Sequence, residues 1–326
     1  MKKRMSTIVT MLAVAAICLT GCGNNNAQTA EPADTSAEET ADEEQAEETD
    51  AATTETADAE KSTDTAIMVV SFGTSYNDSR DITIGAIENA IADAFPQYEV
   101  RRAFTSQIII DKLKERDGLE IDNVQEALDR AAADGIKNLI VQPTHLMDGH
   151  EYTDLKDELE GYKDSFENIS LGAPLLTSDE DFEAVIKAIT DATASYDDGE
   201  TAVVFMGHGT DADSNEVYAK LQEKLTADGF EHYYIGTVEA TPSLDDIKAA
   251  LKEAGTYKKV VLEPLMVVAG DHANNDMAGD EDESWKSQLT AEGYEVECLI
   301  HGLGENEAIQ QIYVEHTQAA VDGLNK

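Results

Sequence analysis

The sequence predicts an α/β protein of two similar, doubly wound lobes, each built on a parallel sheet, around a central cleft. Two observations lead to this fold class. From about residue 66 onward, short apolar runs alternate with longer helical stretches, which is the pattern of parallel strands with helices on both faces. In addition, several segments of the first half recur in the second. Right-handed connections would bring the strand carboxyl ends of both halves to one cleft, where open α/β folds bind their ligands.

Three pairs of similar segments support the division into halves. The pairs are residues 66–75 with 202–215, residues 138–151 with 259–272, and residues 170–192 with 298–319. In this alignment Phe72 takes the place of His208, and Glu151 falls opposite His272. We therefore predict an N-terminal lobe over residues 66–198 and a C-terminal lobe over residues 199–326, meeting at a cleft.

Hydrophobic periodicity places the elements of the first lobe. The expected strands are 67–71, 98–104 and 138–142, and the expected helices are 79–95, 106–115, 123–134 and 153–163. The longest of these helices is supported by an apolar stripe between Ile82 and Ile91 at helical spacing. Residues 170–192 complete the lobe with a strand-like start, a turn and a closing helix.

The second lobe repeats the same scheme. The expected strands are 202–206, 233–238 and 259–263, and the expected helices are 214–228, 244–254 and 282–292. Residues 298–319 again give a strand-like start, a turn and a closing helix.

Residues 1–22 have the composition of a bacterial lipoprotein signal peptide. Lys2, Lys3 and Arg4 precede an apolar run over residues 8–19, and the stretch ends in Leu-Thr-Gly-Cys. A short apolar core between a basic start and small residues is typical of a secretory signal and is too short for a comfortable membrane span. The ending resembles a lipobox, so we expect Cys22 to become the lipidated first residue of the mature protein. The alternative is a plain signal peptide whose cysteine is incidental.

Residues 23–65 are predicted to form a disordered acidic tether. They consist mainly of Ala, Thr, Glu and Asp and contain no aromatic residue, so they cannot bury enough apolar surface to offset the entropy of ordering. Together with the signal, this segment predicts an exported protein. It would be lipid-anchored through Cys22 to the outer face of the cell membrane, or lie in a periplasm.

The charge of the chain restricts its partners. The formal net charge is −44, most of it on residues 66–326. Nucleic acid is therefore excluded as a partner, because the sequence offers no basic footprint. Contact with a membrane would need the lipid anchor, since anionic lipid repels an acidic protein. Only Cys298 remains once the signal is removed and Cys22 is lipidated, so no internal disulfide is expected. The sequence leaves homo-oligomerisation open.

Three candidate metal ligands follow three different strands of the second half. His208 comes after the strand 202–206, Glu239 ends the strand 233–238, and His272 lies beyond the third strand. Two imidazoles and a carboxylate suit a divalent cation such as cobalt, nickel, zinc or iron with open coordination positions. The alternative, residue by residue, is a strand-end histidine satisfied by backbone and a surface or capping carboxylate. Their common position at one sheet edge favours the metal site.

Several motifs, in order along the chain, carry a resemblance to a known family. They are VVSFGTS (69–75), RAFTS (102–106), GHEY (149–152), FMGHG (205–209), VEATPS (238–243), PLMVVAGDHANNDMAGDEDESWK (264–286) and GLGEN (302–306), with His145 shortly before GHEY. From residue 66 to the C-terminus the chain resembles the anaerobic cobalt chelatases, the sirohydrochlorin cobaltochelatases of CbiK type in the class II chelatase superfamily. The resemblance implies two α/β lobes around a tetrapyrrole cleft and the insertion of Co²⁺, with Ni²⁺, Fe²⁺ or Zn²⁺ as other candidate metals.

The resemblance also implies roles for individual residues. The family's metal-binding histidine of MGHG, glutamate of V-E and histidine of GDH correspond to His208, Glu239 and His272. His208 would also accept a proton, and Glu151 of the G-x-E-Y segment would be a second proton acceptor in the cleft. An alternative for Glu151 is that it only begins the following helix. His150 stands where an acidic residue is expected in the family, which adds an extra ligand or base near the site.

Other residues near these motifs have two interpretations each. His145 would face the substrate or be a hydrogen-bonded structural histidine. Met266 and Met277 are expected in the core or the cleft wall and not as ligands.

Two features fit cytoplasmic cobalamin assembly poorly. The acidic chain repels the carboxylates of sirohydrochlorin at long range, although Arg80, Arg101 and Arg102 would offer local cations unless they are solvated or paired. The predicted export also differs from a cytoplasmic pathway. The alternative functions are a surface lipoprotein that captures or demetallates a metal-tetrapyrrole or binds a metal ion for uptake, and a transporter-associated substrate-binding lipoprotein.

Overall fold

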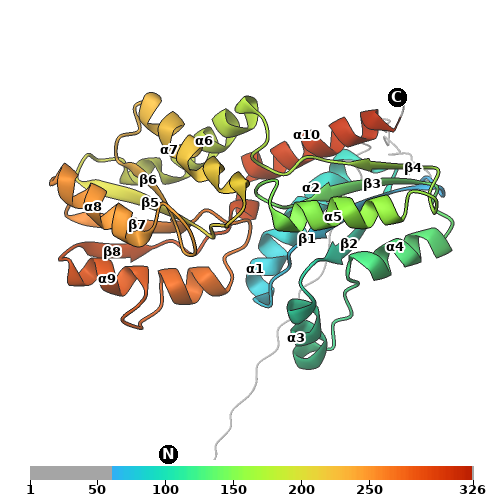
Figure 1. The fold of residues 1–326 in the computed structure, drawn as a ribbon, viewed down its shortest axis with the longest axis horizontal. Helices are drawn as coiled ribbons and strands as arrows, with labels where there is room; N and C mark the ends of the chain where they lie inside the picture. The colour runs from blue at the N-terminus through green and yellow to red at the C-terminus, as the bar shows by residue number, and fades with distance from the viewer. Residues whose placement is uncertain (1–60, 325–326) are drawn as a thin grey trace, which may run out of the picture. The chain divides into compact units, whose positions relative to one another are not determined.

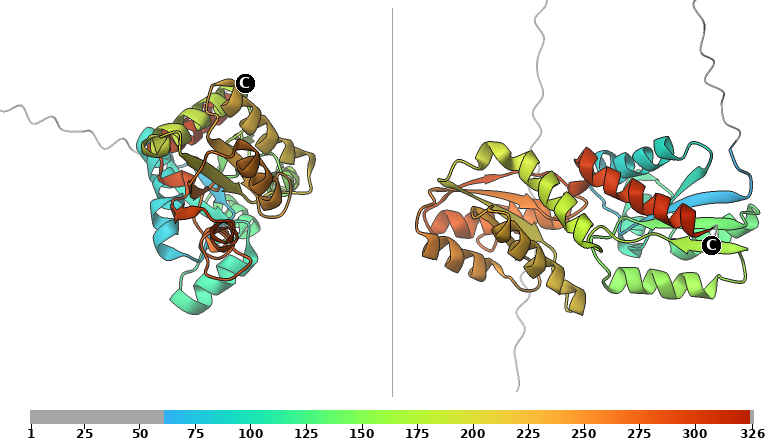
Figure 2. Two further views of the ribbon diagram at one scale, coloured as in Figure 1. Left: turned by 90° about the vertical axis from the view of Figure 1, so that its left-hand side faces the viewer. Right: turned by 90° about the horizontal axis from the view of Figure 1, so that it is seen from above.

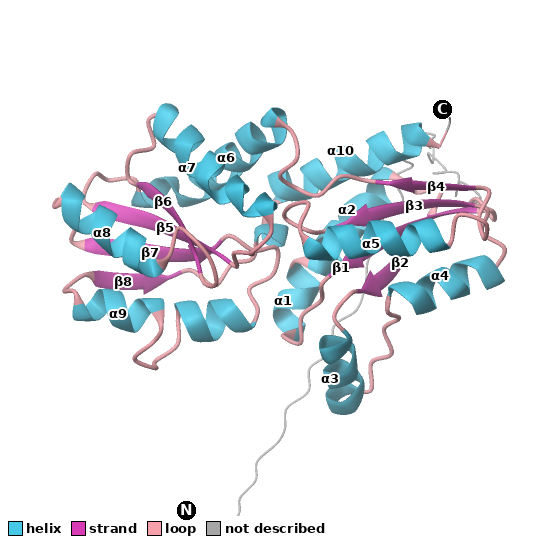
Figure 3. Cartoon of the chain, viewed as in Figure 1, coloured by secondary structure: helices cyan, strands magenta, loops and turns pink. Residues whose placement is uncertain are grey.

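The predicted fold class is confirmed by two parallel four-stranded sheets. The computed structural model describes residues 61–324, so the predicted signal peptide and the tether up to residue 60 lie outside the described residues. The strand order is β2-β1-β3-β4 in the first sheet and β6-β5-β7-β8 in the second. Because the two orders correspond strand by strand, the internal repeat of the sequence is also a repeat of topology. Helices lie on both faces of each sheet (Figure 3).

The first half contains four strands and six helices within the described residues. The strands are β1 (Thr65–Ser71), β2 (Glu99–Phe104), β3 (Asn138–Pro143) and β4 (Asn168–Leu171). The helices are α1 (Asn77–Ile82), α2 (Ile84–Ala94), α3 (Gln107–Asp117), α4 (Val124–Ala133), α5 (His150–Gly161) and α6 (Asp179–Thr193). The fold begins slightly before the predicted boundary at residue 66, because Asp64 O accepts hydrogen bonds from the N–H groups of Lys137 and Asn138.

The second half follows the same plan. Its strands are β5 (Thr201–Gly207), β6 (Tyr233–Thr237), β7 (Lys259–Pro264) and β8 (Glu295–Cys298). Its helices are α7 (Glu216–Ala227), α8 (Leu244–Ala254), α9 (Trp285–Ala291) and α10 (Glu307–Gly323), with a π-helical segment at Ala273–Met277 and a 3₁₀ turn at Leu303–Glu305. Every residue of β1 and β5 is buried, as expected for central parallel strands covered on both faces.

Three predicted helices differ from the observed ones by three residues or more, and the helix expected from residue 282 begins at Trp285. The helix expected over residues 79–95 is two helices, α1 and α2, which meet at Thr83. The Thr83 hydroxyl donates to Ser79 O, and such back-bonding bends a helix. Gly304 also passes so close that a Cβ there would lie 3.0 Å from the Thr83 backbone. The helix expected from residue 153 begins at His150 instead, so Glu151 lies in its first turn.

The last helix of each half covers the sheet of the other half. α10, drawn in red, lies beside α2 and β3 (Figures 1 and 2). Its Tyr313 hydroxyl donates to Thr144 O at 3.0 Å. Conversely, α6 packs against α7, and Thr193 at its end hydrogen-bonds the Tyr233 hydroxyl on β6 at 3.2 Å. The two halves are thus joined by exchanged helices as well as by the chain between them.

One pair of matched positions distinguishes the interiors of the two sheets. Gln142 on β3 is fully buried, and its amide donates to Pro143 O and Ala173 O at 2.8 and 3.0 Å. Glu263 takes the same place on β7, next to Phe205 in the sheet register. Its Oε2 is buried and has no hydrogen-bond partner among residues 61–324, and burial raises the pKa of this carboxyl to about 7. Glu263 is therefore a half-buried acid, with one carboxyl oxygen buried, where the first half has an amide.

We predict that Glu263→Gln stabilises the protein in a pH-dependent way. The folded state binds a proton on Glu263 between pH 4.5 and 7 that the unfolded state has released, so stability falls as the pH rises through this window. The shift in pKa corresponds to a loss of at most about 3 kcal/mol in the free energy of unfolding at pH 8. The stability gained by Glu263→Gln should therefore largely vanish below pH 4.5. Thermal unfolding at pH 4.5 and pH 8 measures the difference in stability between the wild type and the variant. Glu295→Gln, at an exposed position, is the control. Equal midpoints for wild type and Glu263→Gln at pH 8 would contradict the prediction.

Candidate metal centre

His208 is held at the end of β5 by two glycines. Gly207 has no room for a side chain, because a Cβ would lie 2.3 Å from the ring of Tyr218. Gly209 has φ +86°, a conformation that favours glycine. The His208 Nδ1 lies 2.9 Å from Gly209 O, where an N–H on Nδ1 can donate. The exposed Nε2 is then left with a free lone pair, which is the state of a metal ligand.

Glu239 is placed beside His208 by the main chain. Val238 N–H donates to Gly207 O at 3.0 Å and Glu239 N–H donates to His208 O at 2.9 Å, so the pairing of β5 with β6 continues past both strands. The Glu239 Oε2 lies 4.0 Å from His208 Nδ1. The two side chains therefore share one small volume at the carboxyl end of the sheet.

His272 reaches the same place from the third strand. It lies immediately before the π-helical segment Ala273–Met277 that follows β7. Its Nδ1 lies 2.7 Å from Asp276 Oδ2, four residues along. A carboxylate on one imidazole nitrogen holds the ring in the tautomer whose other nitrogen can bind a metal. Asp276 was missed from the sequence, although its spacing of four residues from His272 was the available signal.

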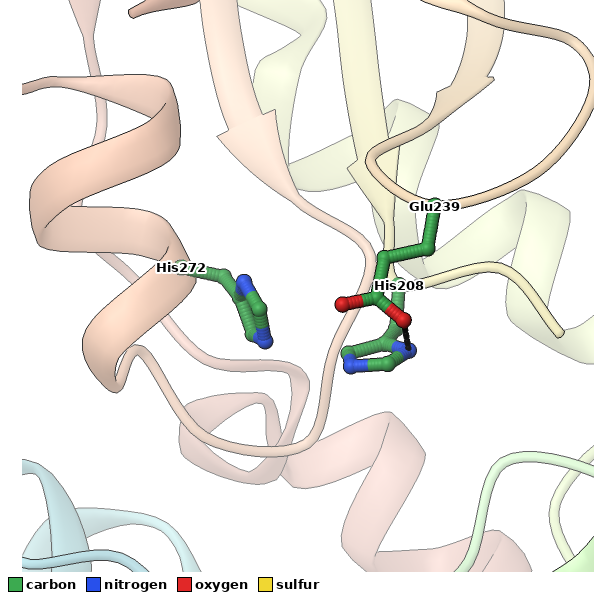
Figure 4. A group of neighbouring side chains, drawn as sticks. All are labelled: His208, Glu239 and His272. Carbon is green, nitrogen blue, oxygen red and sulfur yellow. Dashed lines mark ion pairs between the residues drawn. The ribbon is translucent and has the colours of Figure 1, made fainter. Parts of the chain in front are cut away.

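His208, Glu239 and His272 converge as the sequence suggested. Their ligand atoms all lie within 4.8 Å of one another, and they form the one such group of three found among residues 61–324. The two imidazole rings are 4.6 Å apart, edge to face, and Figure 4 shows all three side chains directed into a common space. Two nitrogens and one carboxylate oxygen suit a borderline divalent cation. Because His208 and Glu239 are exposed, other ligands can complete the coordination.

Glu151 lies outside this group of three. It is an exposed side chain in the first turn of α5, where a carboxylate is favourable at a helix N-terminus. Burial of the hydroxyl is the main cause that raises the pKa of Tyr218, the residue packed under Gly207, and the charge of Glu151 adds to this increase. The neighbouring His150 Nε2 lies 2.7 Å from Asp211 Oδ1. The start of α5 therefore lies against the loop that follows His208.

His145 is not hydrogen-bonded through its ring. The side chain is 9% exposed, and neither ring nitrogen has a partner among the described residues. Burial lowers its pKa to about 4, so His145 is neutral at pH 7. Met277 is fully buried and Met266 packs against the same core cluster under the second sheet, as expected for core methionines.

The matched position in the first half carries an aromatic side chain. Phe72 follows β1 as His208 follows β5, and it is 50% exposed. The next residues contact the loop that carries His272, because Ser79 Oγ accepts from Ala269 N–H at 3.1 Å and the Tyr76 hydroxyl donates to Asp271 at 3.4 Å. The first half thus borders the metal centre without supplying any of its three ligand groups.

Known proteins match this chain over nearly all of the described residues. Residues 65–322 match the family model described as cobalt chelatase (CbiK). The chain is 40% identical over 257 residues to the sirohydrochlorin cobaltochelatase of Salmonella typhimurium, covering 79% of this chain and 96% of the relative. It is 34% identical over 265 residues to the sirohydrochlorin cobaltochelatase CbiKC of Nitratidesulfovibrio vulgaris, covering 81% and 93% respectively.

Solved structures show the same fold at low sequence identity. SirB from Bacillus subtilis with Fe³⁺ superposes with a TM-score of 0.56 at 15% identity, covering 81% of this chain and 98% of SirB. SirB of the subspecies spizizenii in complex with cobalt superposes with a TM-score of 0.54 at 14% identity, covering 80% of this chain and 97% of that protein. The family match spans nearly all of the described residues, so the chain belongs to the CbiK family of cobalt chelatases.

Proposed function

We propose that this chain is a sirohydrochlorin cobaltochelatase, which inserts Co²⁺ into sirohydrochlorin. The observation that carries the proposal is the convergence of His208, Glu239 and His272 within 4.8 Å at an open sheet edge. The activity printed for the relatives from Salmonella typhimurium and Nitratidesulfovibrio vulgaris supports it. In this reaction the metal is a substrate, so a site with few and exposed ligands suits its transfer.

The chemistry of insertion assigns a task to each ligand. Two pyrrole N–H protons leave the macrocycle as the dication enters, and pyrrole nitrogens replace the protein ligands one after another. His208, Glu239 and His272 hold the ion from one side, which leaves its remaining positions for the pyrrole nitrogens. As the ion leaves, the His208 Nε2 lone pair becomes free and can accept one of the protons.

Glu151 is proposed as the second proton acceptor. It is exposed at the start of α5, and the adjacent His150 contacts Asp211, three residues after His208. A carboxylate at this place stands beside the metal centre without belonging to it. This role is compatible with its favourable position in the first turn of the helix.

We predict that His208→Ala lowers kcat/KM for cobalt insertion by at least about 100-fold, because it removes a ligand and a proton acceptor together. The side chain is exposed, so the unfolding midpoint should stay within about 1 °C of the wild type. Anaerobic absorbance spectroscopy with sirohydrochlorin and Co²⁺ measures turnover. His232→Ala, which removes a histidine bonded to Tyr257, is the control. Full activity of His208→Ala would contradict the assignment.

The chain is further proposed to work outside the cytoplasm, anchored by lipid on Cys22. The basic start, the apolar run and the Leu-Thr-Gly-Cys ending support this location. In residues 61–324, no helix combines the length and apolarity that crossing a membrane requires.

We predict that Cys22→Ala moves the protein from the membrane fraction to the soluble fraction, because the lipid would be its only hold on the membrane. Fractionation followed by detection with an antibody measures this change. Ser6→Ala, in the basic start of the same segment, is the control. Unchanged membrane association of Cys22→Ala would contradict the lipid anchor.

We also predict that deletion of residues 23–60 leaves kcat and KM of the solubilised protein within about twofold, because an acidic tether without aromatic or branched aliphatic residues contributes no packing. The deletion must stop before Asp64, because its carbonyl oxygen accepts hydrogen bonds from the N–H groups of Lys137 and Asn138. A large loss of turnover would show that the tether acts as more than a spacer.

A further inference from the structure

The arginines that the sequence offers for substrate carboxylates are engaged by the protein's own acids. Arg101 pairs with Glu99 at 2.8 Å and Asp134 at 2.7 Å. Arg102 makes two hydrogen bonds to Glu88, one of them at 2.7 Å. Since a paired guanidinium offers little to a further anion, these two residues do not explain how an acidic protein receives a polycarboxylate.

Arg80 is also engaged. It is 6% exposed, its Nη1 donates to Asn77 at 2.9 Å, and its Nη2 lies 3.2 Å from Asp81. The cation for a substrate carboxylate must therefore come from elsewhere.

A cavity of about 640 Å³ beside the metal centre contains two other cations. Its walls come from α1, from the start of the His272 loop at Ala269, and from Asn274, two residues after His272. Lys112 and Arg116 of α3 line the remaining side. They are four residues apart, so both lie on one face of the helix.

Lys112 is the cation of this cavity whose side chain has no partner in the part of the chain that the structure describes. Among residues 61–324 its ammonium group has neither an ion-pair nor a hydrogen-bond partner, and the side chain is exposed. The Arg116 guanidinium donates hydrogen bonds to Asp117 and, at 2.7 Å, to Asn77 Oδ1. An exposed lysine that faces a cavity can receive a carboxylate without first breaking an internal ion pair.

The two acids that line the cavity do not pair with Lys112. Glu305 accepts hydrogen bonds from Gly302 N–H at 2.9 Å and lies 2.9 Å from His301 Nδ1. Asp78 lies in the first turn of α1. Apolar wall is supplied by Ile82, which is 52% exposed, and by Ile300. The cavity thus combines an apolar surface with one uncommitted cation, as a ring edge bearing carboxylates requires.

We propose that this cavity seats one edge of the tetrapyrrole, with Lys112 binding a peripheral carboxylate and Arg116 assisting. The proposal rests on sirohydrochlorin as the substrate, as inferred above. In this arrangement the second half holds the metal, and α3 of the first half orients the macrocycle through the carboxylates on the rim of the macrocycle. Lys112 is a positioning residue, because it contacts the rim and not the reacting nitrogens.

The test compares Lys112→Ala with Lys114→Ala and Lys112→Arg. Lys114 is on the same helix, outside the cavity lining, and pairs with Glu120 at 3.2 Å. The full chain is titrated with metal-free sirohydrochlorin under anaerobic conditions, and quenching of intrinsic fluorescence gives Kd. Loss of one charge-assisted contact should raise Kd about tenfold in Lys112→Ala. Lys114→Ala should stay within about twofold, and Lys112→Arg should restore most of the affinity.

Two further readouts separate this role from a structural one. In the cobalt assay KM should rise with Kd while kcat changes by less than about twofold, because the contact is equally strong before and during metal transfer. The affinity of Lys112→Ala should also depend less on salt than that of the wild type. Unchanged Kd in Lys112→Ala, or an equal loss in Lys114→Ala, would overturn the proposal.

The binding assay also distinguishes this proposal from the proposed activity. A wild type that binds sirohydrochlorin in a Lys112-dependent way but never inserts cobalt would support the binding site and reject the chelatase. A wild type that turns over, with Lys112→Ala unaffected in Kd and KM, would retain the chelatase and reject the site. Absence of any sirohydrochlorin binding by the wild type would overturn both.

Discussion

The metal centre depends on two backbone hydrogen bonds that continue the β5–β6 pairing beyond the strands. Val238 N–H to Gly207 O and Glu239 N–H to His208 O hold His208 and Glu239 side by side, although both side chains are exposed. Their positions are therefore set by the sheet and not by packing of the side chains themselves. His272 is oriented by another device, the Asp276 carboxylate on its Nδ1. A site prepared in this way needs little rearrangement when an ion arrives.

Because the two halves exchange helices α6 and α10, the first half is held in place beside the carboxyl end of the second sheet. α10 contacts the first sheet through Tyr313 and α6 contacts the second through Thr193, so movement of one lobe against the other would disturb buried contacts. The loop leading to His272 also rests on the first half through Ser79 and Tyr76. The first half therefore surrounds the candidate metal centre and carries the proposed macrocycle contact at Lys112, while the second half carries the three candidate ligands.

The repeated halves have diverged at matched positions. Where the second half has His208, the first has the exposed Phe72, and where the second has the half-buried acid Glu263, the first has the hydrogen-bonded amide Gln142. The fold tolerates either residue at both places, because the strands around them are buried and paired in the same register. The three candidate metal ligands lie in one half, while the architecture is kept in both.

The fold class and most elements could be predicted from the sequence, because the period of apolar residues records which faces are buried. It also placed His208 and Glu239 at strand ends, and an internal repeat indicated two lobes. Four features could be found only in the folded protein: the break at Thr83, the exchange of α6 and α10, the distances between the three candidate ligands, and the pairing of Arg101 and Arg102 with acids of the first half. The lack of a side-chain partner for Lys112 among residues 61–324 is a further such feature. These features arise from contacts between residues distant in the chain, and local periodicity carries no information about such contacts.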